Sequence, residues 1–586
     1  MESFYARSHV LHVCHATGIR PVAGVYFVVK NIEGLMKDSE WHQSMRFVSR
    51  SCIHPPHVET INRVFGPKPE KVEWAKRVEI SNLSKARFMM KLWHHVLSVL
   101  LLLVMAALPA RGAGLEDKVV ERTLKNGMKL LMVERHNSPT IAAWIRFKVG
   151  SVDERSDERG VAHLLEHMLF KGTKTLGTTD YAAEKPLLDQ IEATARELIN
   201  EKAKREKGDP VKVEKLGERL TVLEKDASQY VVKEEFADIY ARNGGTGYNA
   251  FTSKDGTTYL INLPANKLEL WAAIESDRMQ NAVLREFYTE RSVVMEERRR
   301  SYDAEPEGKL WETFLATSFL AHPNGQPVIG WMSDIENLTR TKAEDFLHRY
   351  YAPNNAIVAI VGDIDANKTL DLVEKYFGNI PPGTPVAPVA TEEPEQQGER
   401  RVEVIGDANP QVYLGFHKPT LPHPDEYVFD VIDMVLSDGR TSRLYKKLVI
   451  EKQLVTDIGA FTAPGHRYPN LFIIAATPRT PHTVGEVEAA IKEAIELLKR
   501  EPVSAQELEQ IQNKLEYQEV QQMGSNGGLA RNLTEYEAIA GTWRYLIEHR
   551  KKVAEVKPED VQRVARKYLT EENRIVGYIT KKEGAQ

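Results

Sequence analysis

Two segments far apart in the chain share one pattern. AEDFLHRYYAPNNAIVAIVGDI (residues 343–364) and PEDVQRVARKYLTEENRIVGYI (residues 558–579) each combine an acidic helix start, an aromatic helix end, an Asn-bearing turn and a β-branched strand. Because a repeated pattern of this length indicates a repeated structural unit, the chain is expected to build the same unit twice. The predicted fold class is α+β, with two homologous α/β sandwich-like units in which helices cover a sheet.

A stretch rich in Pro, Glu and Thr separates the two units. NIPPGTPVAPVATEEPEQQGER, residues 379–400, has the composition of an extended linker. We therefore expect an N-terminal domain over residues 116–378 and a homologous C-terminal domain over residues 401–586. The first of these domains would carry the chemistry described below, and the second has no metal motif.

The composition counts against nucleic-acid binding and limits the residue types that could form a metal site. The formal net charge is only -5 and the lysines and arginines are dispersed, so we expect no nucleic-acid partner. Both cysteines, Cys14 and Cys52, lie near the N-terminus, ahead of the apolar segment discussed next. A chain that begins after that segment has no thiol, so a metal site in it must be built from histidines and carboxylates.

A short apolar run, Val96–Leu108, follows a basic flank and precedes the small residues of PARGAG. A membrane span needs about 20 apolar residues, so the run is typical of a secretory signal peptide. We assign residues 89–112 to it, with cleavage after Ala110 or Gly112, and an uncleaved anchor as the alternative. The protein is then expected to be periplasmic or secreted, with no stable membrane span after cleavage.

Residues 1–88 show no sustained hydrophobic periodicity. We expect them to form no stable domain, or to result from a mis-assigned start, because Met89 and Met90 stand directly before the basic end of the signal. The segment VVERTLKNGMKLLMVERH (119–136) alternates around Asn126-Gly127 and predicts a β-hairpin. Strands are also expected within residues 245–263, followed by a helical stretch from Lys267 to about Tyr302.

Between residues 184 and 236 the chain is long, charged and periodic. Leucines, isoleucines and valines recur at helical spacing, and Gly208-Asp209-Pro210 interrupts them midway. This pattern predicts two antiparallel helices that form an inserted hairpin in the first domain.

The sequence HLLEH at residues 163–167 is the strongest chemical signal. His163 and His167 are four apart, so on a helix both imidazoles lie on one face and can bind one cation. A solvated helix face is the alternative. The apolar neighbours count against it, because three ionisable groups on a buried helix are costly unless they are paired or metal-bound.

A catalytic zinc needs a third protein ligand, and YTERSVVMEERRRS (288–301) offers candidates. Glu290 and Glu297 are seven apart, two helical turns, and therefore share a face, whereas Glu296 points elsewhere. Glu166 could reach the water molecule rather than the metal. Zinc lowers the pKa of such a water and polarises a carbonyl, which is the chemistry of peptide hydrolysis.

Three motifs in the same order, HLLEHMLFKGT, NAFTS and ERSVVMEE, resemble the pitrilysin or insulinase group of metallopeptidases. The resemblance covers most of residues 116–586 and is closest to short two-domain members, such as the mitochondrial processing peptidases and bacterial relatives. It implies one Zn²⁺ per chain, bound by His163, His167 and Glu297. It also implies Glu166 as the catalytic base and Glu290 as an acid that orients His163 or its neighbour.

The resemblance also implies how substrate binds. In the family NAFTS lies on an edge strand that pairs with the substrate backbone, so Asn249, Ala250 and Phe251 would line the cleft. Main-chain pairing of this kind accepts many sequences. The expected substrates are therefore peptides or unfolded protein segments.

The chain departs from the family pattern at two places. The spacing from His167 to Glu297 is longer than usual, and the helical hairpin accounts for the excess, either as a protrusion over the cleft or as a surface embellishment. Family members with complete sites also carry an Arg and, seven positions later, a Tyr. Val449 and Thr456 stand in those places here, so another residue or a partner subunit would supply these contacts.

The sequence therefore predicts an exported zinc metalloendopeptidase. It is expected to act as a homodimer, or as a heterodimer with a related metal-free subunit. The alternative is a non-catalytic or assembly subunit that binds peptides. The complete HLLEH with Glu297 counts against this alternative, and the missing Arg and Tyr count for it.

Overall fold

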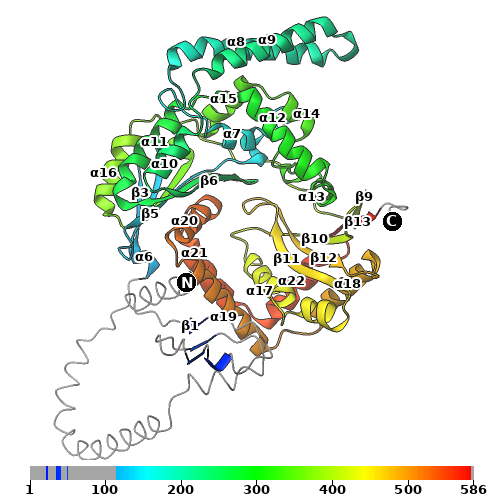
Figure 1. Ribbon diagram of the computed structural model, residues 1–586. Coiled ribbons are helices and arrows are strands. Elements are labelled where there is room, and N and C mark those ends of the chain that lie inside the picture. Colours follow the sequence, from blue (N-terminus) through cyan, green and yellow to red (C-terminus); the bar gives the residue numbers. More distant parts are fainter. Residues whose placement is uncertain (1–21, 24–34, 38, 41–48, 51–113, 582–586) are drawn as a thin grey trace, which may run out of the picture. The chain divides into compact units, whose positions relative to one another are not determined.

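The computed structural model describes residues 22–23, 35–37, 39–40, 49–50 and 114–581 (Figure 1). The chain divides into two compact units, residues 1–112 and 113–586. In the first unit, the two-residue strands β1 (Val22–Ala23) and β2 (Ser49–Arg50) pair in parallel. The signal peptide expected at residues 89–112 lies outside the described residues, as does most of the leader. None of the described helices combines the length and the apolar character needed to cross a bilayer.

The first half of the larger unit contains a six-stranded sheet with the order β3-β4-β8-β5-β7-β6. Its strands are β3 (Val119–Thr123), β4 (Lys129–Glu134), β5 (Thr140–Phe147), β6 (Thr246–Thr252), β7 (Thr257–Pro264) and β8 (Ala356–Gly362). β3 and β4 form the hairpin predicted around Asn126-Gly127, where Gly127 has φ +86° and the turn needs a glycine.

Helices of the first half cover one face of this sheet. They include α7 (Val161–Met168), α10 (Glu235–Arg242), α11 (Leu268–Asn281), α12 (Phe287–Arg298), α15 (Arg340–Tyr350) and α16 (Ala366–Phe377). Strand residues of one parity, such as Met132, Ile145 and Ile360, are buried with these helices in one core. The short helix α14 (Met332–Glu336) contacts α12 and buries Ile335 in the same core, and the short helix α6 (Leu115–Lys118) precedes β3.

The opposite face of the six-stranded sheet is covered by a helix from the second half. Strand residues of the other parity, such as Trp144 and Ala359, form a separate core with Leu529 and Leu533 of α20 (Asn526–Ala540). Because side chains alternate along a strand, one strand can supply both cores. This explains why β8 is buried at every position.

The second half repeats the arrangement with five strands in the order β11-β12-β10-β13-β9. They are β9 (Arg400–Gly406), β10 (Gln411–Lys418), β11 (Val455–Ala463), β12 (Asn470–Pro478) and β13 (Arg574–Lys581). The helices of this half are α17 (Glu426–Ser437), α18 (Val484–Arg500), α19 (Ala505–Gln522), α20, α21 (Tyr545–Glu555) and α22 (Pro558–Tyr568). The π-helix η7 (Tyr445–Glu451) precedes β11.

Each half of the larger unit covers the sheet of the other half with one of its helices. α13 (Pro306–Ser318), from the first half, packs on β9 and β13, and its Phe314 is buried with Ile473 and Ile575 of the second sheet. A Cβ atom at Gly415 or Gly577 would lie 2.6 or 2.7 Å from the Phe314 ring, so these strands need glycine for the helix to approach. Strand order and exchanged helices together confirm the predicted fold of two homologous α+β units.

The inserted hairpin consists of α8 (Tyr181–Ala203) and α9 (Pro210–Ser228) and projects from the first half (Figure 1). As predicted, the break lies at Gly208-Asp209-Pro210, where the Asp209 carboxylate caps α9 and Pro210 is its first residue. The expected end at residue 236 was too late, because Phe236 already belongs to α10.

The helical stretch predicted from Lys267 to about Tyr302 is not continuous. The chain forms α11, breaks at residues 282–286, and continues as α12 and the π-helix η4 (Arg299–Asp303). Tertiary contacts cause the break, since Ala282 bridges to Thr173 and the Val283 N–H donates to the Gly172 carbonyl. Residue spacing carries no information on such contacts.

Candidate metal centre

Helix α7 presents HLLEH because its other side is fully buried. Val161, Leu164, Leu165 and Met168 have no exposed surface. The helix starts after Gly160, which has φ +89°. The Glu154 carboxylate accepts the backbone N–H groups of Gly160 and Ala162, each at 2.9 Å, and so caps the helix.

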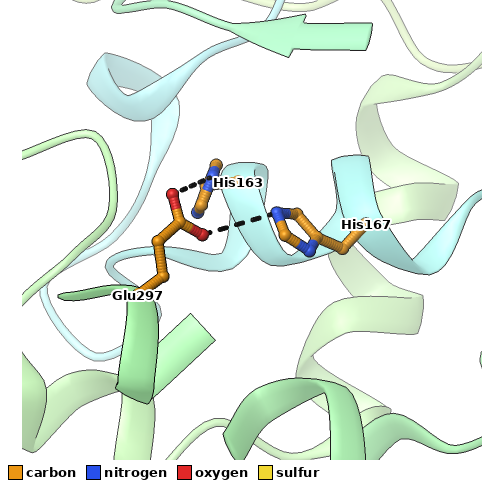
Figure 2. A group of neighbouring side chains, drawn as sticks. All are labelled: His163, His167 and Glu297. Carbon is orange, nitrogen blue, oxygen red and sulfur yellow. Dashed lines mark ion pairs between the residues drawn. The ribbon is translucent and has the colours of Figure 1, made fainter. Parts of the chain in front are cut away.

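His163, His167 and Glu297 converge on one point (Figure 2). Nε2 of His163 lies 3.8 Å from Oε1 of Glu297, and Nε2 of His167 lies 3.7 Å from Oε2. Ligand atoms bound tetrahedrally to one zinc ion lie about 3.3 to 3.5 Å apart, whereas one ligand atom from each of the three side chains lies within 4.8 Å of the other two. The side chains would therefore close by about 1 Å to bind zinc. The donor set of two imidazoles and one carboxylate also fits this metal.

The protonation of His163 favours metal binding as well. Burial, followed by the nearby His167, lowers the pKa of His163 to about 3. The ring is therefore neutral at physiological pH, which is the form that binds a metal. Its Nδ1 is buried and has no hydrogen-bond partner within the described part of the chain.

Glu290 contacts His167 and not His163, which settles the choice that the sequence left open. Its Oε1 lies 2.9 Å from Nδ1 of His167, and its Oε2 lies 2.7 Å from Nζ of Lys171. The His167 hydrogen bond lowers the pKa of Glu290 to about 2, although burial opposes it. Burial lowers the pKa of His167, but Glu290 outweighs this effect and the net pKa is raised. A carboxylate at Nδ1 directs Nε2 toward the Glu297 side.

Glu166 lies beside this group, on the same helix. Its Oε2 accepts a hydrogen bond of 2.6 Å from Oγ1 of Thr252, on strand β6. Burial raises the pKa of Glu166, and the Thr252 bond partly offsets the increase. A raised pKa suits a carboxylate that must accept a proton near neutral pH.

A cavity of about 500 Å³ adjoins Glu166 and His167. Asn249 lines it, together with Phe170, Lys171 and the segment 231–234 that follows the helical hairpin. Ala250 is buried, and Phe251 packs edge to face on Trp144, so these two offer mainly their backbone to a bound peptide. In the described part of the chain, β6 is an edge strand with β7 as its sheet neighbour.

The positions expected for an Arg and a Tyr lie in the second half. Val449 is in the π-helix η7 and packs against the core of that half. Thr456 is exposed on β11, where Oγ1 donates to the Thr477 carbonyl at 3.3 Å. Neither side chain can make the contacts of the residue it replaces.

Sequence reasoning missed three residues that surround the site. Lys171 and Thr252 lie inside the quoted motifs HLLEHMLFKGT and NAFTS, so the motifs themselves contained the signal. Lys171 follows His167 by four positions, although it already lies beyond the end of α7. Glu154 belongs to a charged loop that offered no distinguishing pattern.

Comparison with known proteins adds independent findings. A sequence profile described as Insulinase (Peptidase family M16) matches residues 129–186 and 224–330. A second, described as Peptidase M16 inactive domain, matches residues 337–515. The gap at residues 187–223 falls within the α8–α9 hairpin, so the hairpin is an addition to the family pattern.

Individual relatives agree with the profiles. The zinc protease PqqE of Helicobacter pylori is 28% identical over 460 residues, which is 76% of this chain and 89% of that protein. An uncharacterised zinc protease of Mycobacterium leprae is 28% identical over 353 residues, 58% of this chain and 64% of its own length. The crystal structure of a protease from Helicobacter pylori superposes with a TM-score of 0.67 at 26% identity, covering 79% of this chain and 99% of that one.

Proposed function

Because the chain belongs to the insulinase family of peptidases, family M16, we propose that it is a zinc-dependent endopeptidase acting on peptides or unfolded protein segments. The observation that carries the proposal is the convergence of His163, His167 and Glu297 beside a base, Glu166, whose carboxylate is held by Thr252. Residues kept only for folding have no need for this arrangement.

The chain's own residues account for most of the reaction. A zinc ion at the site would lower the pKa of a water molecule and polarise the scissile carbonyl. Glu166 accepts the proton of the attacking water and returns it to the leaving amine. The free edge of β6 pairs with the substrate backbone, which holds an extended segment across the site without reading its side chains.

We propose that a partner subunit completes the substrate site. Val449 and Thr456 cannot supply the contacts of an Arg and a Tyr, and this half matches a profile described as an inactive domain. The partner would be a second copy of this chain or a related metal-free subunit. The same observations favour the second candidate function, a non-catalytic subunit that binds peptides.

The test compares Glu166→Gln and His163→Ala with the wild-type protein. Glu166→Gln is expected to retain about one zinc per chain by elemental analysis and to lose peptide cleavage by at least about 100-fold. His163→Ala is expected to lose both. Full activity in Glu166→Gln would contradict the assigned base. A zinc-bound wild-type protein that cleaves nothing, even when mixed with related subunits, would favour the binding function.

We also propose that the chain is exported through the apolar segment Val96–Leu108. The basic flank and small-residue exit of this segment support the proposal. Fractionation of cells that express the full chain, followed by N-terminal sequencing, tests it. We expect an extracytoplasmic product that begins after Ala110 or Gly112, and a cytoplasmic product that keeps residues 89–112 would refute it.

A further inference from the structure

Thr252 links the proposed catalytic base to the proposed substrate strand. It is the last residue of β6, and its hydroxyl donates to Oε2 of Glu166 at 2.6 Å across 86 residues of sequence. Asn249, Ala250 and Phe251 directly precede it on the same strand. The side chain is partly buried, so water competes weakly for this hydrogen bond.

The position of the Thr252 hydroxyl is tightly fixed. Its β-branched side chain has few rotamers, and its cross-strand partner is Thr257, which is fully buried. The Thr257 hydroxyl donates to the Val149 carbonyl at 3.0 Å, so its hydrogen is already used. The hydroxyls of Thr252 and Thr257 are 3.5 Å apart.

The turn after Thr252 is held from the second half of the unit. The buried carboxylate of Asp255 accepts the backbone N–H groups of His466 and Arg467 at 3.0 and 2.8 Å. Ser253 closes the turn by donating its N–H to the Gly256 carbonyl at 2.8 Å. Both ends of the short β6–β7 connection are therefore fixed, and Thr252 cannot follow Glu166 if that side chain rotates.

We propose that Thr252 is a positioning residue for the peptidase reaction, because its hydroxyl fixes Oε2 of Glu166 and so sets the direction in which this carboxylate accepts the proton of the water. The inference rests on the proposed function. It also follows that one strand sets both the register of the substrate and the direction of the base. Peptide pairing on β6 and proton transfer at Glu166 are then geometrically coupled.

Three substitutions test the role of the hydroxyl. Thr252→Val keeps the shape and removes the donor, and Thr252→Ser keeps the donor. Thr258→Val is the matched control, because Thr258 lies on the neighbouring strand and its buried hydroxyl has no hydrogen-bond partner among the described residues. We expect Thr252→Val to lower kcat about 10- to 100-fold with KM within about twofold. Thr252→Ser and Thr258→Val should stay within about threefold of wild type.

A purely structural role for Thr252 would give a different result. Loss of β6 geometry would raise KM, because the substrate pairs with that strand, and would lower the melting temperature. Crystal structures provide a readout independent of turnover. The Glu166 carboxylate should occupy more than one orientation in Thr252→Val and a single orientation in wild type and Thr252→Ser.

Two outcomes would overturn the inference. The first is an active wild-type enzyme in which Thr252→Val retains kcat, which would leave the proposed function intact. The second is a Thr252→Val structure in which Glu166 keeps its single orientation. A zinc-bound wild-type protein without peptidase activity in any subunit combination would refute the proposed function itself, and this inference with it.

Discussion

Glu290 connects a cation and a proposed metal ligand through its two oxygens. Oε2 of Glu290 pairs with Lys171, and Oε1 contacts Nδ1 of His167. The Lys171 contact therefore fixes the orientation of the carboxylate that orients the imidazole. Partners of this kind orient a ligand ring and raise its basicity. Nζ of Lys171 also lies 3.6 Å from Oε2 of Glu286, so the three charged side chains form a row along the cavity that adjoins His167.

Glu290→Gln is expected to weaken zinc binding about 10- to 100-fold without unfolding the protein, since the amide keeps the shape and loses the charge. Competition with a chelator of known affinity measures the change. Glu296→Gln is the matched control, because Glu296 lies on the same helix, is exposed, and pairs only with Arg299 in the described structure. Equal zinc affinity in both variants would contradict the role of Glu290.

His549 in the second half is held between two carboxylates. Nδ1 lies 2.9 Å from Glu519 on α19, Nε2 lies 2.7 Å from Asp430 on α17, and the rings of Tyr427, Tyr536 and Tyr545 surround it. Burial lowers the pKa of His549, but the two carboxylates outweigh it and raise the pKa to about 10. The histidinium therefore clamps α17, α19 and α21 together.

This clamp predicts a stability that depends on pH. The folded pKa lies above the unfolded value of about 6.5, so the stabilisation is complete below pH 6.5 and is lost as the pH rises toward 10. His549→Gln should cost about 3 kcal/mol at pH 7 and much less at pH 10. Melting temperatures of both proteins across this range measure the effect. A constant difference between the two would show that His549 is not charged in the folded state.

The sequence predicted some residues of the metal centre better than others. The pairing of His163 with His167 follows from helical periodicity, because their spacing lies within one helix. Periodicity offered both Glu290 and Glu297 as candidates for the third ligand, and the family resemblance, not the spacing, indicated Glu297. The Thr252 and Glu290 contacts join different elements, so periodicity cannot identify their partners. The sequence left open whether Glu290 served His163 or His167 for the same reason.

At the scale of elements, the α8–α9 hairpin is anchored only near its base in the described structure. The Glu184 carboxylate pairs with Arg285, with both side chains fully buried, and Glu192 accepts hydrogen bonds from Tyr288 and Thr341. Farther out, the two helices contact each other, as in the pair of Lys212 and Glu197. We therefore expect the distal part to be separable from the fold.

Replacing residues 198–212 by a short glycine-rich turn is expected to leave zinc content unchanged and the melting temperature within about 3 °C. The contrasting variant is Glu192→Ala, which removes the anchor to α12 and α15 and should cost about 2 kcal/mol or more. Elemental analysis and thermal melts test both. Loss of zinc on shortening the hairpin would show that the tip supports the metal centre.

The linker shows where composition misleads. Residues 379–399 contain neither helix nor strand, as their proline and glutamate content predicts. They are nevertheless anchored, since Glu393 accepts the backbone N–H groups of Leu320, Ala321 and His322, and Gln396 donates to the carbonyls of Glu572 and Arg574. Composition predicts the absence of regular structure but not the presence of such anchors.

At the scale of the larger unit, the reciprocal exchange of α13 and α20 ties the two halves together. The amphipathic pattern of either helix shows that one face is buried, but not which sheet covers it. The sequence therefore predicted two related halves correctly and gave no sign that each completes the other.

Neither half should fold alone. Residues 114–390 lack α20, so the apolar face that includes Trp144 and Ala359 would be exposed, and the fragment should be insoluble. Co-expression with residues 391–581 should restore a soluble complex that binds zinc. Size-exclusion chromatography and metal analysis check both statements. A soluble, cooperatively melting fragment 114–390 would show that the exchange is dispensable.

The same exchange determines when the polypeptide can finish folding during its synthesis. The last strand of the first sheet, β8, ends at Gly362, whereas the helix that covers its outer face begins at Asn526. The ribosome must therefore add more than 160 residues while that surface has no cover. A nascent chain of this design stays incompletely folded until nearly all of it has been translated. The late completion prolongs its need for a chaperone. It also prolongs the time during which the chain is unfolded enough to pass through a narrow pore.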